Sequence, residues 1–284
     1  MSIYIGTSGF SYKGWEANAI PSKKNFYVGK SNLKEYSTHF NVCEINSTFY
    51  KTPSVKTVQS WYKDGNNFIV KVNKYLTHAK KLSEWETLFP EFYDVISNLK
   101  EKLVGFLIQL PPQMSIKCLN KIVQAAKFCK EQYPNVDFYI EFRHSTLFCE
   151  QVYDTLRGLI SIVFVNQYGV AKDMPKGFSP SLDDFEKALT VPNKVMFRNH
   201  GTWSSQAYCG SYSDEDLAMI ASLTCSMTKT IVIFDNTDSF EGQLEIHLPG
   251  NKSVFSMSIQ FMDTILPCAV ADAKRMKNIL YNFV

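Results

Sequence analysis

The sequence lacks the features of several protein classes. No apolar run is long enough to span a bilayer, and residues 1–6 have no basic start followed by a long apolar core. We therefore expect a cytoplasmic protein that makes no contact with a membrane. The formal net charge is only +3, from 30 basic and 27 acidic side chains. Bulk charge does not favour nucleic acid as a partner, although it leaves a local basic site open.

Motifs for metals, disulfides and dinucleotides are also missing. The seven cysteines are odd in number, include no CxxC pair and mostly lie in apolar patterns, which is typical of reduced core thiols. The early Gly6-Thr7-Ser8-Gly9 lacks the GxGxxG spacing of a dinucleotide-binding turn. These absences predict no particular cofactor and leave a divalent metal open.

Eight short apolar segments, rich in β-branched and aromatic residues, have the pattern of buried strands. They lie at 3–8, 42–48, 68–73, 104–110, 138–143, 160–166, 194–200 and 230–235. Segments with helical spacing alternate with them, at 31–40, 53–63, 83–100, 115–133, 145–158, 181–189 and 213–229, and a final helix is expected at 271–283. This alternation predicts an α/β fold, a (β/α)8 TIM-like barrel forming a single domain over residues 1–284. An open doubly wound sheet is the competing arrangement.

One segment, at about 239–266, breaks the alternation. Alternating apolar residues at 242–248 and 253–261 flank a turn at 249–252, which predicts a β-hairpin inserted before the last helix. A two-stranded hairpin is marginal alone, so its apolar face needs a partner. Two packings remain open: against the barrel, where the hairpin would cover the pocket, or against a second copy. The protein would then be a monomer or a homodimer through the hairpin.

Polar side chains stand near the carboxyl end of every predicted strand. They are Ser8, Glu44, Asn46, Lys71, Asn73, Gln109, Glu141, Arg143, Asn166, Arg198, His200 and Asp235. Apolar residues alternate with most of them, so these polar side chains are expected to face the barrel axis, while Asn199 leaves the facing of the seventh strand open. Because the carboxyl ends of the strands meet at one mouth of such a barrel, we expect a ligand site there.

The charged members of this set predict acid–base chemistry on a small anionic, polar or sugar-like molecule. Lys71, Arg143 and Arg198 are expected to bind it, because ammonium and guanidinium groups donate to phosphate and carboxylate. Glu44, Glu141 or His200 would transfer protons. We expect Glu44 to be held by Lys71.

Loop residues are expected to complete the site. His78 lies just beyond the third strand, and Phe49 and Tyr50 follow the second as candidate pocket walls. Tyr208 and Tyr212 lie in a long loop, from which their hydroxyls could reach over a ligand. Together with Ser8, Asn46, Gln109 and Asp235, these residues form the predicted substrate-binding set.

Several motifs in order along the chain resemble the YecE-like family of uncharacterised TIM-barrel proteins. They are IGTSGFSY at 5–12, EINSTFY at 44–50, QLPP at 109–112, EFRH at 141–144, HG at 200–201, residues 208–217 and FDNT at 234–237. The resemblance implies a TIM barrel with a pocket at the strand ends, and it implies no established reaction. Phe10 stands where a tryptophan is usual in the family, and 239–266 lengthen a link that is usually short.

Two alternative functions remain open. The family's barrel resembles those of metal-dependent sugar isomerases and endonucleases, and by that analogy a metal-dependent phosphodiesterase acting on nucleic acid is the first. Glu44, Glu141, His200 and Asp235 are suitable ligand types for a divalent metal, but they form no HxH or HExxH pair, and the nearby cations oppose a metal. The second is a non-catalytic ligand-binding or assembly module.

Overall fold

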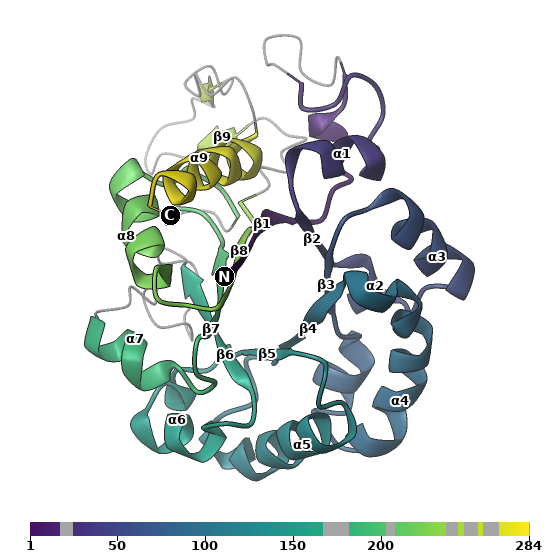
Figure 1. Ribbon diagram of the computed structural model, residues 1–284, viewed down its shortest axis with the longest axis vertical. Coiled ribbons are helices and arrows are strands. Elements are labelled where there is room, and N and C mark those ends of the chain that lie inside the picture. The colour runs from purple at the N-terminus through teal and green to yellow at the C-terminus, as the bar shows by residue number, and fades with distance from the viewer. Residues whose placement is uncertain are drawn as a thin grey trace.

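The computed structural model describes residues 1–17, 25–166, 182–202, 208–236, 244–246, 255–257 and 267–283. Eight parallel strands form a closed barrel in chain order (Figure 1). They are β1 Ser2–Ser8, β2 Val42–Ile45, β3 Phe68–Lys71, β4 Leu103–Gln109, β5 Phe138–Glu141, β6 Ser161–Asn166, β7 Lys194–Asn199 and β8 Lys229–Phe234. Since β1 pairs with both β2 and β8, the sheet has no free edge. The predicted barrel is confirmed, and the open sheet is wrong.

Helices surround the barrel as an outer ring (Figure 1). They are α1 Leu33–His39, α2 Ser47–Tyr50, α3 Val55–Asp64, α4 Trp85–Ile96, α5 Leu119–Gln132, α6 Glu150–Leu156, α7 Leu182–Ala188, α8 Asp214–Thr224 and α9 Cys268–Phe283. Short 3-10 helices cover Lys13–Trp15, Ser97–Lys102, Ile116–Cys118 and Ser145–Leu147, and a π-helix covers Tyr75–Ala79. In the part of the chain that the structure describes, no helix has the length and apolar character needed to cross a membrane.

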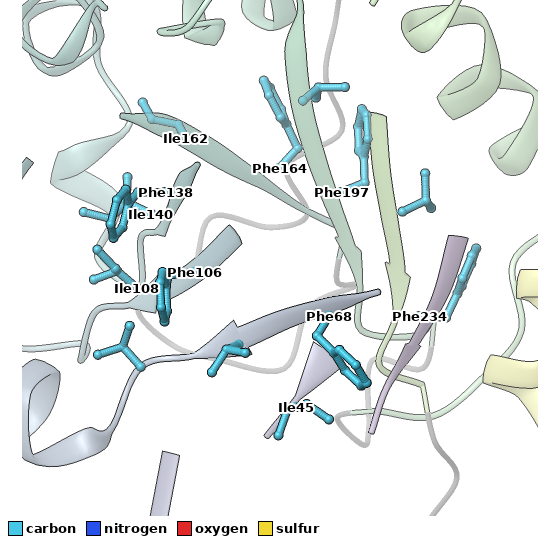
Figure 2. Packing of buried hydrophobic residues seen from close by; sticks show 14 of the residues in the cluster. Ile45, Phe68, Phe106, Ile108, Phe138, Ile140, Ile162, Phe164, Phe197 and Phe234 are labelled. Atoms are coloured by element: carbon cyan, nitrogen blue, oxygen red, sulfur yellow. The ribbon is translucent and has the colours of Figure 1, made fainter. Parts of the chain in front are cut away.

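Strand side chains alternate between two apolar clusters. The larger cluster lies between the barrel and its helices, and Figure 2 labels ten of its members: Ile45, Phe68, Phe106, Ile108, Phe138, Ile140, Ile162, Phe164, Phe197 and Phe234. The smaller cluster lies inside the barrel and includes Val42, Tyr139, Met196 and Ile233. Two positions after these four residues come Glu44, Glu141, Arg198 and Asp235. Because side chains two positions apart share a face of a strand, the alternation brings these charged groups to the barrel axis.

The second strand is shorter than predicted. It ends at Ile45, and Asn46 has helical dihedral angles that begin the one-turn helix α2. The Thr48 hydroxyl donates to the Lys71 carbonyl oxygen at 2.7 Å, which ties this turn to the end of β3. The turn brings Phe49 beside the Lys71 side chain.

Two very short strands lie in the segment where a hairpin is predicted. β9 Leu244–Ile246 and β10 Phe255–Met257 pair antiparallel. The turn between them lies outside the described residues. The complete hairpin, its packing and any dimer contact therefore stay predictions.

Candidate active site at the carboxyl end of the barrel

Arg198 is the centre of the polar end of the barrel, and its side chain is fully buried. Its Nε and Nη2 donate to the two carboxylate oxygens of Glu44 at 2.8 and 2.7 Å. Its Nη1 donates to Glu141 Oε2 at 2.5 Å and to His200 Nε2 at 2.9 Å. Its Nη2 also donates to Asp235 Oδ2 at 2.9 Å. A guanidinium group has five N–H donors, so these five hydrogen bonds use all of them.

This arrangement differs from the expected pairing. Glu44 forms its ion pair with Arg198 rather than with Lys71. Arg198 lies on β7 and reaches Glu44 on β2 through the barrel interior, where a planar fork matches a carboxylate at two points. No N–H of Arg198 is left over for a ligand.

Ser8 and Asn46 extend the network at the ends of β1 and β2. The Ser8 hydroxyl donates to Glu44 Oε1 at 2.8 Å, and the Asn46 amide donates to the Ser8 oxygen. Asn46 Oδ1 is buried and has no hydrogen-bond partner among the described residues. A buried acceptor of this kind is a candidate ligand contact, because leaving it unpaired is unfavourable.

Glu141 lies between two arginines. Arg198 donates to its Oε2, and Arg143 forms an ion pair with its Oε1. Burial acts to raise the pKa of the Glu141 carboxyl, but the charges of Arg143 and Arg198 hold that pKa well below its usual range. Glu141 is therefore ionised at neutral pH. Arg143 also lies 3.5 Å from Gln109 Oε1, which places Gln109 at the same mouth.

His200 is buried and neutral. Its Nε2 accepts a hydrogen bond from Arg198, which can only donate, so the proton of the neutral ring lies on Nδ1. Burial and the charges of Arg198 and Arg143 hold the pKa of His200 well below its usual range. In the described part of the chain, Nδ1 has no hydrogen-bond partner. The site thus contains one buried N–H donor that a ligand could satisfy.

Asp235 is held less tightly than the other two carboxyl groups. Only one Arg198 N–H donates to it, and its side chain keeps 12% exposure, whereas those of Glu44 and Glu141 are fully buried. Burial raises the pKa of Asp235, although the charge of Arg198 opposes this shift. A raised pKa makes this carboxyl group better suited to transfer a proton than one with its usual pKa.

Lys71 has an environment unlike that of Arg198. Its ammonium lies 4.5 Å from the centre of the Phe49 ring, and it has no hydrogen bond or ion pair with any described residue. Burial lowers the pKa of Lys71, and the charge of Arg198 lowers it further. The carboxylates of Glu44, Glu141 and Asp235 act in the opposite direction and only partly offset this shift. The mouth therefore holds one cation without a described counter-ion.

His78 lies on the Lys71 side of the mouth, as expected. Its ring packs edge-on against Phe49 at 5.0 Å, and its Nδ1 lies 2.8 Å from the Thr77 hydroxyl. Burial lowers its pKa, as do the charges of Lys71 and Arg143. The π-helix that carries it, Tyr75–Ala79, was not predicted, because a single extra residue in a helical turn leaves no clear periodic signal.

The two loop tyrosines lie in different environments. The Tyr212 side chain is 2% exposed, and its hydroxyl accepts from the Gly201 N–H at 2.8 Å and donates to the Asn166 carbonyl at 2.7 Å. It ties the ends of β6 and β7 together and does not reach over the mouth. Tyr208 is 40% exposed, and its ring centre lies 5.2 Å from that of His200. Tyr208 therefore contacts the charged network through His200.

One further carboxylate, Asp272 in α9, was not predicted from the sequence. Its side chain is fully buried and accepts from the Tyr212 backbone N–H at 3.1 Å, from Asn236 Nδ2 at 2.8 Å and from Arg275 Nη2 at 2.6 Å. It connects the last helix to the loops after β7 and β8. Its only sequence signal is an Asp-x-x-Arg spacing, which is equally typical of an exposed helix surface.

Metal ligation has little support in this arrangement. Within the described residues, no three His, Cys, Asp or Glu side chains are placed to hold a metal ion. The carboxylates of Glu44, Glu141 and Asp235 instead converge on the Arg198 guanidinium.

The fold and the site define a parallel (β/α)8 barrel that carries a buried, charge-paired network at the carboxyl ends of its strands. A sequence model of the family described as "Protein of unknown function DUF72" matches residues 4–245, and the chain belongs to this family. The resemblance found in the sequence is confirmed. Family membership does not assign a reaction.

Individual relatives agree with this classification. UPF0759 protein YunF of Bacillus subtilis (strain 168) is 24% identical over 238 residues, which are 76% of this chain and 80% of that protein. UPF0759 protein YecE of Escherichia coli (strain K12) is 30% identical over 112 residues, 38% of each chain. The crystal structure of a DUF72 family protein from Enterococcus faecalis V583 aligns with a TM-score of 0.71 at 18% identity, covering 98% of this chain and 95% of that one. This structure supports the fold.

Proposed function

We propose that the protein is an enzyme that performs acid–base chemistry on a small anionic or hydroxyl-rich molecule at the carboxyl end of the barrel. The observation that carries this proposal is the burial of Glu44, Glu141 and Arg198 in one network. Moving each of these ions out of water costs several kcal/mol. Apolar side chains of similar volume would fill the same space without that cost. A charged cluster that lowers stability in this way favours a chemical role. Its location favours the same role, because barrels of this type have their active sites at the carboxyl ends of the strands.

Ligand binding is assigned to the groups that retain hydrogen-bonding capacity. Lys71 supplies a positive charge for a phosphate or carboxylate, with Arg143 beside Glu141 as the second cation at the mouth. Asn46 Oδ1 and His200 Nδ1–H supply an acceptor and a donor suited to hydroxyl groups. Arg198 positions the carboxylates and is not itself a ligand contact.

Proton transfer is assigned to Asp235, which is predicted from the sequence as a substrate-binding residue. Its pKa is raised, and it has one hydrogen bond from Arg198 where Glu44 has two. Glu141 has a lowered pKa and is a poor proton donor at neutral pH. His200 has a pKa far below its usual range, so a neutral donor role replaces the acid–base role expected for it.

Thermal unfolding in the presence of small anions tests the proposal. The probes are inorganic phosphate, sugar phosphates and nucleotides, applied to wild type, Lys71→Met and the control Lys130→Met, which removes an exposed lysine of α5. We expect at least one probe to raise the Tm of wild type and the control but not that of Lys71→Met. If no probe raises any Tm, the proposal is wrong.

Turnover separates an enzyme from a binding module. A probe that binds and is converted supports the enzyme. Saturable binding without conversion of any probe favours the non-catalytic alternative. Cleavage of abasic-site DNA that depends on an added divalent metal would favour the phosphodiesterase alternative.

A further inference from the structure

The lysines of this barrel differ in how their ammonium groups are satisfied. Lys194 and Lys229 are half-buried at the amino end of the barrel, and both pair with Asp137, at 2.6 and 2.7 Å. Lys102 is half-buried as well, and it donates to two backbone carbonyls, those of Tyr62 at 2.5 Å and Gly65 at 2.8 Å. These contacts are what a structural lysine requires when it loses water.

Lys71 does not follow this pattern. It is half-buried at the carboxyl end of β3, yet its ammonium makes no hydrogen bond or ion pair with the described residues. The carboxylates around it are already held, since Arg198 binds Glu44, Glu141 and Asp235, and Arg143 binds Glu141. Among the described residues, Lys71 therefore has no counter-ion of its own, and its charge adds little to the stability of the fold. Its amine is available for chemistry.

We propose that Lys71 is a covalent catalytic residue, whose ε-amine forms an imine with an aldehyde or ketone ligand at the mouth of the barrel. This inference rests on the proposed function, because it names the substrate class and the reacting atom of the same site. An amine attacks a carbonyl only in its unprotonated form, and a lysine that is desolvated or beside another cation meets that condition at lower pH. Both conditions hold for Lys71, since burial and Arg198 lower its pKa.

Asp235 supplies the proton transfers that the reaction needs. Asp235 lies close enough to Lys71 for the charges of the two groups to act on each other, and burial raises the pKa of its carboxyl. The amine lone pair forms the C–N bond while the carbonyl oxygen takes the Asp235 proton. The nitrogen then returns one proton to Asp235, and the carbinolamine hydroxyl takes it and leaves as water. The products are an iminium cation, one water and the Asp235 carboxylate, so no oxidant or reductant is required.

Phe49 is placed to stabilise the cationic product. Its ring centre lies 4.5 Å from Lys71 Nζ, within the range of a cation–π contact. The ring is held by edge-on contacts with Tyr50 at 5.2 Å and with His78 at 5.0 Å. An iminium cation formed at Nζ keeps its charge close to this ring, which favours the iminium over the neutral carbinolamine.

Acetylacetone is a suitable probe, because this diketone condenses with free amines and yields a stable enaminone. The full-length wild-type protein is incubated with it near neutral pH, and peptide mapping by mass spectrometry follows the adduct at each lysine. We expect Lys71 to react several-fold faster than the exposed Lys130, since a lowered pKa raises the unprotonated fraction of an amine. Equal rates at the two lysines in folded protein would overturn the proposal.

A second arm uses dihydroxyacetone phosphate with sodium cyanoborohydride, which reduces an imine to a stable secondary amine. Wild type should be labelled at Lys71, and Lys71→Arg, which keeps the charge but cannot form an imine, should lose that adduct while keeping the Tm rise with phosphate. If Lys71 is unlabelled by both probes and the phosphate effect persists, the imine proposal fails and the proposed function stands. If Lys71 is unlabelled and none of phosphate, sugar phosphates and nucleotides raises the Tm, both fail.

Discussion

Arg198 and Glu44, which are 154 positions apart in the chain, form a two-point ion pair inside the barrel, with both side chains fully buried. The pair connects β7 to β2, and the remaining N–H groups of Arg198 connect it to β5 and to the residue after β8. One guanidinium therefore fixes the relative positions of three carboxyl groups. The geometry of this network therefore depends on Arg198.

Replacing Arg198 is expected to destabilise the fold strongly. Arg198→Met leaves the buried carboxyl groups of Glu44 and Asp235 without their cation and leaves Glu141 with Arg143 alone. Breaking a buried pair by removing one partner typically costs about 3–5 kcal/mol. Arg198→Lys keeps the charge but has fewer donors, so its free energy of unfolding should lie between those of wild type and Arg198→Met. Urea unfolding followed by circular dichroism measures the three values.

Arg157→Met is the matched control for this experiment. Arg157 pairs with Asp154 in an exposed position, where the loss of an ion pair costs less than about 1 kcal/mol. A similar small loss for Arg198→Met would contradict the role given to Arg198.

Glu44→Gln and Asp235→Asn should have different effects. In Glu44→Gln, the new amide N–H₂ group would face the N–H donors of Arg198 and could not accept from them. The free energy of unfolding should fall by about 2–3 kcal/mol, as expected for the loss of charged hydrogen bonds. The Asp235 carboxyl, with its raised pKa and single Arg198 bond, should tolerate Asn within about 1 kcal/mol while turnover is lost. Equal destabilisation by the two variants would show that Asp235 is a structural partner like Glu44.

His200 makes stability depend on pH in a defined direction. Its pKa is far below the value of about 6.5 that it has in the unfolded chain, so the unfolded state binds more protons between the two values. Stability from this group is therefore complete above about pH 6.5 and is lost as the pH falls, by up to about 1.4 kcal/mol per pH unit. His200→Asn, which does not titrate, should have a smaller slope between pH 6.5 and 5.

The other titrating groups remain in both proteins of that comparison. His39 and His78 also have lowered pKa values and add slope of the same sign, whereas the raised pKa of Asp235 acts in the opposite direction. The difference between wild type and His200→Asn isolates His200. Identical slopes would mean that His200 is not held neutral by burial.

Tyr212→Phe and Tyr208→Phe should separate a structural hydroxyl from a loop residue at the mouth. Removing the Tyr212 hydroxyl leaves the buried Gly201 N–H without its acceptor, which costs about 1–3 kcal/mol. Tyr208→Phe should leave the free energy of unfolding within about 0.5 kcal/mol of wild type and change only the response to anions. A large loss of stability in Tyr208→Phe, or none in Tyr212→Phe, would reverse these assignments.

Much of the fold could be predicted from the sequence because each strand is buried on both faces. Eight apolar runs alternating with helices favour a closed parallel barrel, and the pairing of β1 with β8 confirms it. The strand ends were less predictable. β2 stops directly before Asn46, and β3 stops two positions before Asn73. The Asn73 side chain accepts from the Tyr75 N–H at 2.8 Å and donates to the Thr48 carbonyl at 3.1 Å in place of the sheet ladder.

The facing of the site residues could be predicted, but their partners could not. The alternation correctly turned Glu44, Glu141 and Asp235 inward, and the contact between Arg198 and His200 settles the facing of β7. The cation that pairs with Glu44 is determined by the distances between β2, β3 and β7 in the folded barrel. These distances cannot be predicted from local sequence patterns. The hydroxyl of Tyr212 is similarly used by backbone groups 11 and 46 positions away.

The most direct test of the central claim is a crystal structure of the protein soaked with inorganic phosphate and, separately, with dihydroxyacetone phosphate. The account predicts density at the carboxyl end of the barrel within hydrogen-bonding distance of Lys71 Nζ, with Arg198 still bonded to Glu44, Glu141 and Asp235. Ligand density only at other surfaces, together with an unchanged Tm, would contradict it.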